Sequence, residues 1–289
     1  MFKIMGVPLS YLPIAAGYLI ARVVADTVHL LSPTLRSAIT SNMRHVLGSE
    51  AEDATIRQAT KNVLRNAARN YFDLIKLPRI KLSDIEKCIT VHDWHNFEDA
   101  LKRGKGVILV SAHLGSYDMT AQIMAARSAK LTVLVEPLEP EALLNHIIGL
   151  RKSKGLSYLP VQLGVLKVVM RSLRSGETIG IICDRDFGRD GYRSTFFGEE
   201  TALPAGAVRI AMRTGAAVVP AFNLRRGDNR YDAYFEPALD IANGGDEALD
   251  RNMEQLIRVM EKYIELCPDQ WVVLSPIWDN VGSAPTSNS

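Results

Sequence analysis

Short, continuous apolar runs alternate with longer amphipathic segments along the last two thirds of the chain. The apolar runs, which are typical of strands buried on both faces, lie at 107–110, 131–135, 178–183 and 217–222. The amphipathic segments, which have helical spacing, lie at 141–154, 165–175, 204–212 and 246–266. This alternation predicts an α/β fold with a twisted, largely parallel central sheet flanked by helices.

The N-terminal region has a different pattern. Residues 4–21 carry no charge and are closed by Arg22, but they include Pro8, Pro13 and Gly17. A spanning helix needs about 20 apolar residues, so we favour an interfacial or packed helix that holds the protein at a membrane over a true span. A signal peptide is an alternative, although no convincing cleavage site follows.

An amphipathic helix is predicted at 54–77, and one side of it is cationic. The stripe consists of Arg57, Lys61, Arg65 and Arg69. Only Asp73 offsets the positive charges of this region, and like charges at helical spacing repel one another. An anionic membrane surface would relieve the repulsion. A solvated face and an acidic carrier protein are the alternatives.

Composition narrows the class of protein without naming a function. The 289 residues are 47% hydrophobic and 23% charged, as in an ordinary globular chain, and the net charge of +2 does not require a nucleic-acid partner. Three widely spaced cysteines suggest neither a disulfide framework nor a zinc site. We predict one domain over 1–281, with a helical, membrane-facing part at 1–82 and an α/β catalytic part at 83–281, and a disordered tail at 282–289.

The strongest chemical signal follows the strand predicted at 107–110. His113 lies just beyond the carboxyl end of this strand, where open α/β sheets place their ligands. Asp118 follows in the first turn of the next predicted helix, from which it could orient the imidazole and leave the other ring nitrogen free to take a proton. A histidine held by a nearby cap is the alternative. The chain has no Gly-x-Ser-x-Gly elbow to supply a nucleophile of its own.

The segment 104–118 resembles the His-x4-Asp/Glu block of the bacterial late acyltransferases, which include lipid A lauroyl and myristoyl transferases and phosphatidylinositol mannoside acyltransferases. Further matching blocks follow in order: Val135-Glu136-Pro137, Arg151 ahead of Gly155, Asp184-Arg185-Asp186-Phe187-Gly188, Phe196-Phe197-Gly198-Glu199, Pro204-Ala205-Gly206 and 216–220. Asp rather than Glu at 118, and the ending at 270–278, favour the mannoside branch.

The resemblance implies a glycerolipid acyltransferase-like fold and a membrane-associated O-acyltransferase. Such an enzyme moves a fatty acyl chain from acyl-CoA or acyl carrier protein to a hydroxyl of a glycolipid, without a further cofactor or metal. It implies a peripheral or single-anchor protein at the cytoplasmic face of the inner membrane.

The resemblance also extends the set of site residues. His113 and Asp118 are the expected catalytic pair. The expected substrate-binding residues are Glu136, Arg151, Asp184, Arg185, Asp186, Glu199 and Gly206. Backbone N–H groups near Gly206, or the Arg151 guanidinium, would stabilise the oxyanion. For the charged residues among them, structural ion pairs and solvated positions are the alternatives.

Two other functions fit part of the sequence. Asp184 and Asp186 follow an apolar strand in the way that the metal-binding carboxylates of many nucleotide-sugar glycosyltransferases do. No glycine-rich phosphate loop accompanies them, and the His113 block would be left without a role. A catalytically inactive membrane-binding scaffold is the other alternative.

Overall fold

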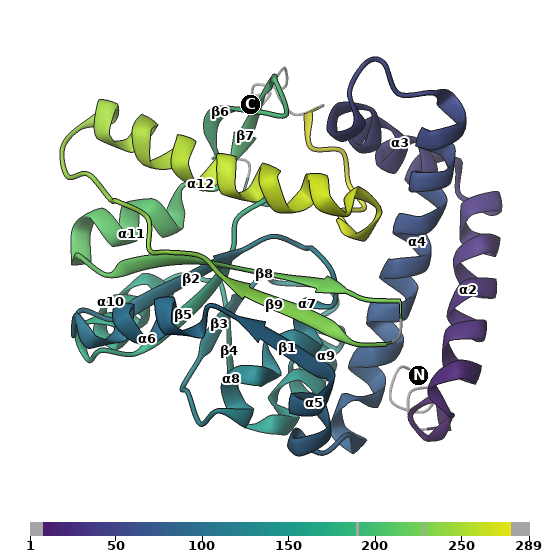
Figure 1. The fold of residues 1–289 in the computed structure, drawn as a ribbon, viewed down its shortest axis with the longest axis horizontal. Helices are drawn as coiled ribbons and strands as arrows, with labels where there is room; N and C mark the ends of the chain where they lie inside the picture. Colours follow the sequence, from purple (N-terminus) through teal and green to yellow (C-terminus); the bar gives the residue numbers. More distant parts are fainter. Residues whose placement is uncertain (1–7, 189–190, 228, 279–289) are drawn as a thin grey trace, which may run out of the picture.

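A computed structural model describes residues 8–188, 191–227 and 229–278, so the tail predicted at 282–289 lies outside the described residues. A seven-stranded sheet of order β1-β9-β8-β2-β5-β3-β4 forms its centre (Figure 1). Its strands are β1 Ile89–His92, β2 Val107–Ser111, β3 Thr132–Val135, β4 Ser157–Pro160, β5 Thr178–Ile182, β8 Ala217–Arg225 and β9 Tyr231–Phe235. All neighbouring pairs are parallel except β8 and β9. The predicted α/β fold with a mostly parallel sheet is therefore confirmed.

Strand β2 has helices on both of its faces. Ile108 and Val110 point into one buried cluster, and Val107 and Leu109 point into the other. All four side chains are at most 6% exposed. This explains why the sequence of β2 is continuously apolar rather than alternating.

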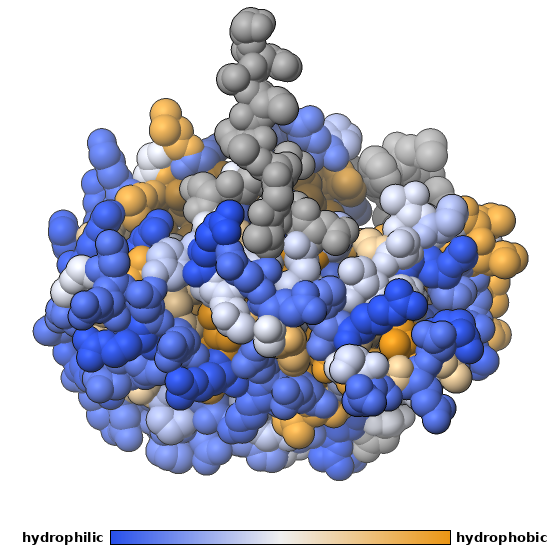
Figure 2. All heavy atoms as spheres, turned by 90° about the horizontal axis from the view of Figure 1, so that it is seen from above, coloured by the Kyte–Doolittle hydropathy of each residue, from blue (hydrophilic) through white to orange (hydrophobic). Residues whose placement is uncertain are grey.

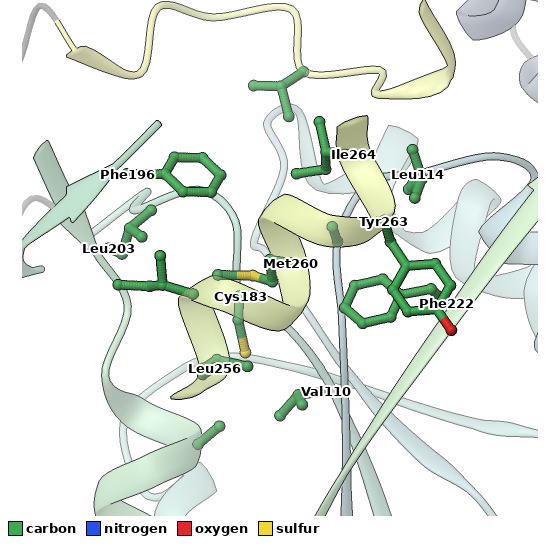
Figure 3. Close-up of a cluster of buried hydrophobic side chains, with 14 of the residues drawn as sticks. Val110, Leu114, Cys183, Phe196, Leu203, Phe222, Leu256, Met260, Tyr263 and Ile264 are labelled. Atoms are coloured by element: carbon green, nitrogen blue, oxygen red, sulfur yellow. The ribbon is translucent and has the colours of Figure 1, made fainter. Parts of the chain in front are cut away.

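The flanking helices divide between the two faces (Figure 1). On one face lie α10 Val165–Arg174, α11 Gly206–Thr214 and α12 Asp246–Leu266. Figure 3 shows Met260 of α12 above Val110 of β2, and the ring of Tyr263 of α12 overlapping that of Phe222 of β8, on which it is stacked. On the other face lie α5 Leu82–Cys88, α6 Trp94–Lys102, α7 Tyr117–Thr120, α8 Gln122–Ala126 and α9 Glu141–Arg151.

Three further helices stand beside the sheet. They are α2 Ile14–Leu31, α3 Pro33–Leu47 and α4 Asp53–Lys76. Helix α4 matches the amphipathic helix predicted at 54–77, and its residues Leu64 and Leu74 reach the two buried clusters. Helix α2 is the outermost element and packs along α4 (Figure 1).

The apolar helix lies later in the chain than predicted. It does not end at Arg22 but continues through Asp26 to Leu31. Arg22 is exposed and Asp26 is paired with α4, so neither charge has to be buried without a partner. Among the described residues, α2 is the one helix long and apolar enough to cross a membrane by length and composition, a property shared by packed helices and signal sequences.

Helices α2 and α4 approach each other closely at Gly17. A Cβ atom built at this position would lie 1.9 Å from the Phe72 ring. Ala21 and Ala25 continue the same small-residue face and are buried. The opposite face of α2 is apolar and exposed, with Leu19, Val23, Leu30 and Leu31 among its residues.

The remaining elements were not individually predicted. An antiparallel hairpin of β6 Tyr192–Phe196 and β7 Glu199–Leu203 stands apart from the main sheet. Short 3-10 helices lie at η1 Leu77–Arg79, η2 Lys152–Lys154 and η3 Pro268–Gln270. After η3 the chain returns to the end of β2, where Leu114 forms an antiparallel bridge with Trp271.

Candidate active site

His113 lies two residues beyond β2, and its partner comes from the neighbouring strand. The Nδ1 atom of His113 lies 2.9 Å from Oδ1 of Asp184, which lies two residues beyond β5. The register pairs Ser111 with Ile182, so the parallel strands bring the two residues side by side. Because Nδ1 donates to this carboxylate, Nε2 is the ring nitrogen that can accept a proton.

Three N–H groups hold the Asp184 carboxylate in place. Besides the imidazole, the backbone N–H of His113 donates at 2.8 Å and the indole of Trp271 donates at 2.7 Å. Burial alone would raise the pKa of this fully buried carboxyl, but the interactions with His113 and Trp271 hold the pKa below its ordinary value. Asp184 is therefore ionised at neutral pH and fixes the orientation of the imidazole.

Asp118 lies in the first turn of α7, as expected, but it does not contact His113 in the predicted way. Its Oδ1 atom lies 2.7 Å from Nε of Arg151, and Oδ2 accepts from the same guanidinium at 3.0 Å. Burial would lower the pKa of Arg151, but Asp118 raises it above its ordinary value. The orienting contact assigned to Asp118 is thus made by Asp184, because the parallel register places the end of β5 beside the end of β2.

A cavity of about 550 Å³ opens beside His113. Its wall is largely apolar and includes Leu109, Ile123, Met124, Leu131, Val133, Val135, Ile147 and Phe222. His113, Asp118 and Arg151 form part of the polar wall. The side chain of His113 is 27% exposed. A ligand with a long apolar portion can therefore be buried with one end at the imidazole.

A second, more polar cavity of about 280 Å³ adjoins the first. Glu136 and Arg185 form an ion pair and, with Phe187 and Ser275, line both cavities. Asp186 lines the second cavity and accepts hydrogen bonds from the backbone N–H groups of Gly188 and Gly191. Four of the seven predicted substrate-binding residues therefore line one or both cavities: Glu136, Arg151, Arg185 and Asp186. A fifth, Asp184, contacts His113 but lines neither cavity.

Two predicted site residues lie elsewhere. Glu199 begins β7, where its carboxylate lies 3.1 Å from Nε2 of His45 on α3. Gly206 begins α11 and is exposed, and among the described residues it does not line the cavity beside His113. Both belong to sequence blocks that resemble the acyltransferase family. In the fold, the block with Glu199 forms part of the β6–β7 hairpin, and the block with Gly206 begins helix α11.

The cationic stripe of α4 faces α2 rather than open solvent over most of its length. Arg65 donates to both oxygen atoms of Asp26 at 2.7 Å, and Lys61 lies 3.8 Å from Asp26. The Arg69 guanidinium lies 5.5 Å from the centre of the Tyr18 ring. Arg57 is exposed. The membrane-docking role predicted for the stripe assumes an exposed face, whereas three of its four residues contact α2.

Sequence reasoning missed several residues that build the site. Trp271 anchors Asp184, and Val272 donates its N–H to the carbonyl of His113 at 2.8 Å. Asn70 of α4 donates to the carbonyl of Gly115 at 2.6 Å. Tyr117 packs edge-on against the imidazole. Except for that of Tyr117, which lies four residues after His113, these contacts join segments far apart in the chain, and no local pattern could have indicated them.

The geometry does not suit the metal site of a glycosyltransferase. That site would need Asp184 and Asp186 to share one ion, but each carboxylate accepts hydrogen bonds from N–H donors of its own. Among the described residues, no group of three His, Cys, Asp or Glu side chains is placed to hold a metal ion.

Comparison with known proteins gives a consistent result. Residues 2–280 match the model of a family described as bacterial lipid A biosynthesis acyltransferase. The chain is 28% identical to the phosphatidylinositol mannoside acyltransferase of Mycolicibacterium smegmatis over 243 residues, which cover 82% of this chain and 77% of the relative. It is also 28% identical to the protein of that name from Mycobacterium tuberculosis over 221 residues, or 74% and 68% of the two chains. The chain therefore belongs to the bacterial lipid A biosynthesis acyltransferase family.

Proposed function

We propose that this protein transfers a fatty acyl chain from a thioester donor to a hydroxyl of a glycolipid, with His113 as the general base. The observation that carries the proposal is the position of His113, whose imidazole is held by the buried Asp184 at the wall of a large apolar cavity. A general base must be within hydrogen-bond reach of the proton that it takes. The Nε2 atom is free to meet an acceptor hydroxyl there.

The proposed reaction is direct attack of the acceptor on the thioester. Nε2 takes the hydroxyl proton as the oxygen bonds to the carbonyl carbon, and Asp184 stabilises the resulting imidazolium. The oxyanion collapses, the C–S bond breaks, and the imidazolium returns the proton to the leaving sulfur. Arg151 and Arg185 line the cavity, each paired with a carboxylate, and we propose their guanidinium N–H groups as hydrogen-bond donors to the carbonyl oxygen on which negative charge develops.

The two adjoining cavities fit the two parts of such a reaction. The apolar cavity suits the acyl chain, whose burial is favourable by roughly 0.8 kcal/mol per CH₂ group. The polar cavity offers the Glu136 carboxylate and the Arg185 guanidinium to the hydroxyl groups of a sugar headgroup. The names of the mycobacterial relatives make a phosphatidylinositol mannoside the first acceptor to test. Acyl-CoA and acyl carrier protein are the two donors that we propose.

We assign membrane contact to the outer face of α2, with the protein at the cytoplasmic face of the inner membrane. Leu19, Val23, Leu30 and Leu31 on this face are each more than half exposed. Figure 2 shows hydrophobic atoms at the right edge of the molecule, the side on which α2 lies in Figure 1, beside a mostly hydrophilic surface. Such a helix can bury its apolar face at the lipid boundary.

Vesicle flotation tests this assignment. Leu30→Glu puts a charge on an exposed position, so the fold should persist while binding to phosphatidylglycerol-containing vesicles falls. Leu266→Glu is the matched control, because Leu266 is 60% exposed at the end of α12. If the two variants bound the vesicles equally well, the assignment of membrane contact to α2 would be wrong.

Thioester turnover tests the catalytic proposal. Purified full-length protein is mixed with palmitoyl-CoA and a panel of glycolipids, with and without EDTA, and thiol release is followed. Acceptor-dependent, EDTA-insensitive release that is lost in His113→Ala is expected. His92→Ala is the matched control, because His92 lies 2.9 Å from Asp232 in a similar pair away from the cavity. No release with either palmitoyl-CoA or palmitoyl acyl carrier protein would overturn the proposal.

A further inference from the structure

A buried ion pair lies behind the turn that carries His113. Asp73 of α4 and Arg225 at the end of β8 are 2.6 Å apart and are 5% and 9% exposed. The proposed reaction uses neither residue. A buried ion pair is maintained only when hydrogen bonds satisfy its remaining atoms. The hydrogen-bond partners of this pair therefore show which segments it holds in place.

Several of these partners belong to the turn after His113. Ser116 donates its hydroxyl to Asp73 at 3.3 Å. Asn70 accepts from Arg225 at 2.8 Å and donates to the carbonyl of Gly115 at 2.6 Å. Three residues separate His113 from α7, and the ion pair holds the last two of them. It holds Ser116 by a direct hydrogen bond and Gly115 by a hydrogen bond made through Asn70.

The turn is confined on its other side as well. Gly115 has φ +61°, and a Cβ atom there would lie 2.4 Å from the carbonyl oxygen of Asn223 on β8. Its N–H donates to the carbonyl of Gln270 at 3.0 Å, and the Gln270 side chain is bonded to both backbone groups of Arg225. A movement of Arg225 would therefore displace the turn both through Asn70 and through Gln270.

Helix α2 supplies one side chain to this network. The hydroxyl of Tyr18 donates to Asp73 at 2.9 Å and accepts from Arg225 at 2.8 Å. The Tyr18 ring lies 5.5 Å from the guanidinium carbons of both Arg69 and Arg225. Burial and the Asp73 carboxylate raise the pKa of the phenol, so it stays protonated and keeps donating.

We propose that Tyr18 is a positioning residue for catalysis, through which the N-terminal helix fixes the turn that carries His113. Its hydroxyl contacts both members of the ion pair, and the pair holds Ser116 directly and Gly115 through Asn70. Without the hydroxyl, a carboxylate oxygen of Asp73 and a guanidinium N–H of Arg225, both on largely buried side chains, each lose a partner. The pair then shifts toward solvent and the turn loosens. The catalytic consequence rests on the proposed function.

The test is Tyr18→Phe in the full-length protein, which keeps the ring and removes the hydroxyl. Hydrogen–deuterium exchange is measured for a peptide covering 113–118 and, as reference, for α12. We expect exchange at the turn to rise about tenfold while α12 is unchanged. The kcat for acyl transfer should fall about tenfold, with the KM for palmitoyl-CoA within about twofold, because the apolar cavity is intact.

Tyr231→Phe is the matched control, because it removes from the same ion pair a hydroxyl that belongs to β9 rather than to α2. The Tyr231 hydroxyl lies 3.2 Å from Arg225 and 3.3 Å from Asp73, so its loss should loosen the turn less than the loss of the Tyr18 hydroxyl. An equal effect of the two variants would overturn the assignment to α2. So would unchanged exchange at the turn, or an increase that extends equally to α12. If the wild-type protein transfers no acyl group, the proposed function fails, and the exchange measurement still decides whether Tyr18 fixes the turn.

Discussion

The two carboxylates predicted near His113 have different roles in the structure. Asp184 is completely buried and accepts three N–H groups, two of them from His113 itself. Asp118 lies closer to His113 in sequence, but its charge is balanced by Arg151 on the cavity wall. Asp184, which follows the neighbouring strand β5, therefore orients the imidazole. Asp118, which is closer in sequence, balances the charge of Arg151 on the cavity wall. The following predictions test this division from the largest expected effect to the smallest.

Replacing His113 by Ala should lower the kcat of acyl transfer about 1,000-fold, since a positioned general base contributes roughly 10²–10⁴-fold. Folding should persist, because the side chain is partly exposed and lies beyond the end of β2. Turnover and circular dichroism measured together check this. A rate within a few fold of wild type would show that His113 is not the general base, and the roles assigned to Asp184 and Asp118 would then fail with it.

Asp184→Asn should lower kcat about 100-fold, because the neutral amide holds the imidazole less firmly and cannot stabilise the imidazolium. Stability should fall by about 2 kcal/mol, since an amide cannot accept from all three N–H groups. Urea unfolding and steady-state kinetics measure the two effects. Asp232→Asn is the control, because it alters the similar His92 pair outside the cavity and should leave kcat unchanged.

Asp118→Asn should lower kcat only about tenfold, because Asp118 acts on the cavity wall and not on the imidazole. It should lower stability by about 3 kcal/mol, because the mostly buried Arg151 loses its counter-charge. The same kinetics and unfolding measurements apply. A loss of kcat as large as that of Asp184→Asn, with unchanged stability, would instead support the catalytic role that the sequence predicts for Asp118.

The smallest expected effect is the dependence of stability on pH. The pKa of Asp184 is lowered in the folded protein, so its contribution is present above the unfolded pKa of about 4 and is lost as pH falls through the folded value. Urea midpoints should show the full contribution from Asp184, unchanged, between pH 7 and 5, and a loss of it below about pH 4. Asp184→Asn should show a shallower loss in that acid range. Identical curves would mean that the carboxylate is not specifically stabilised by His113 and Trp271.

The sequence predicts the strands of this fold better than their order. The buried runs at 107–110 and 178–183 are recognisable because both faces of the sheet are covered, and His113 and Asp184 are both recognisable as residues at strand ends. Strand β5 lies beside β2 because of how the whole sheet packs. No local sequence pattern contains that information. The pairing of His113 with Asp184 depends on that order and was therefore missed.

The same limit applies to the charged face of α4. Its spacing correctly predicts a helix, but the partner of Arg65 is Asp26, which lies 39 residues earlier in a helix expected to end before it. The segment around Trp271 likewise returns to the end of β2 from the other end of the chain. Contacts of this kind are set by the fold, and composition and periodicity do not report them.

The small-residue face of α2 has a practical consequence for handling the protein. Gly17, Ala21 and Ala25 cover a strip of α4 that includes the Phe72 ring, and Arg65 depends on Asp26 for its counter-charge. Removing the first 31 residues would uncover this strip. The shortened chain would lose the exposed apolar face of α2 but would expose the apolar strip of α4 instead. It should therefore be less soluble than the intact protein.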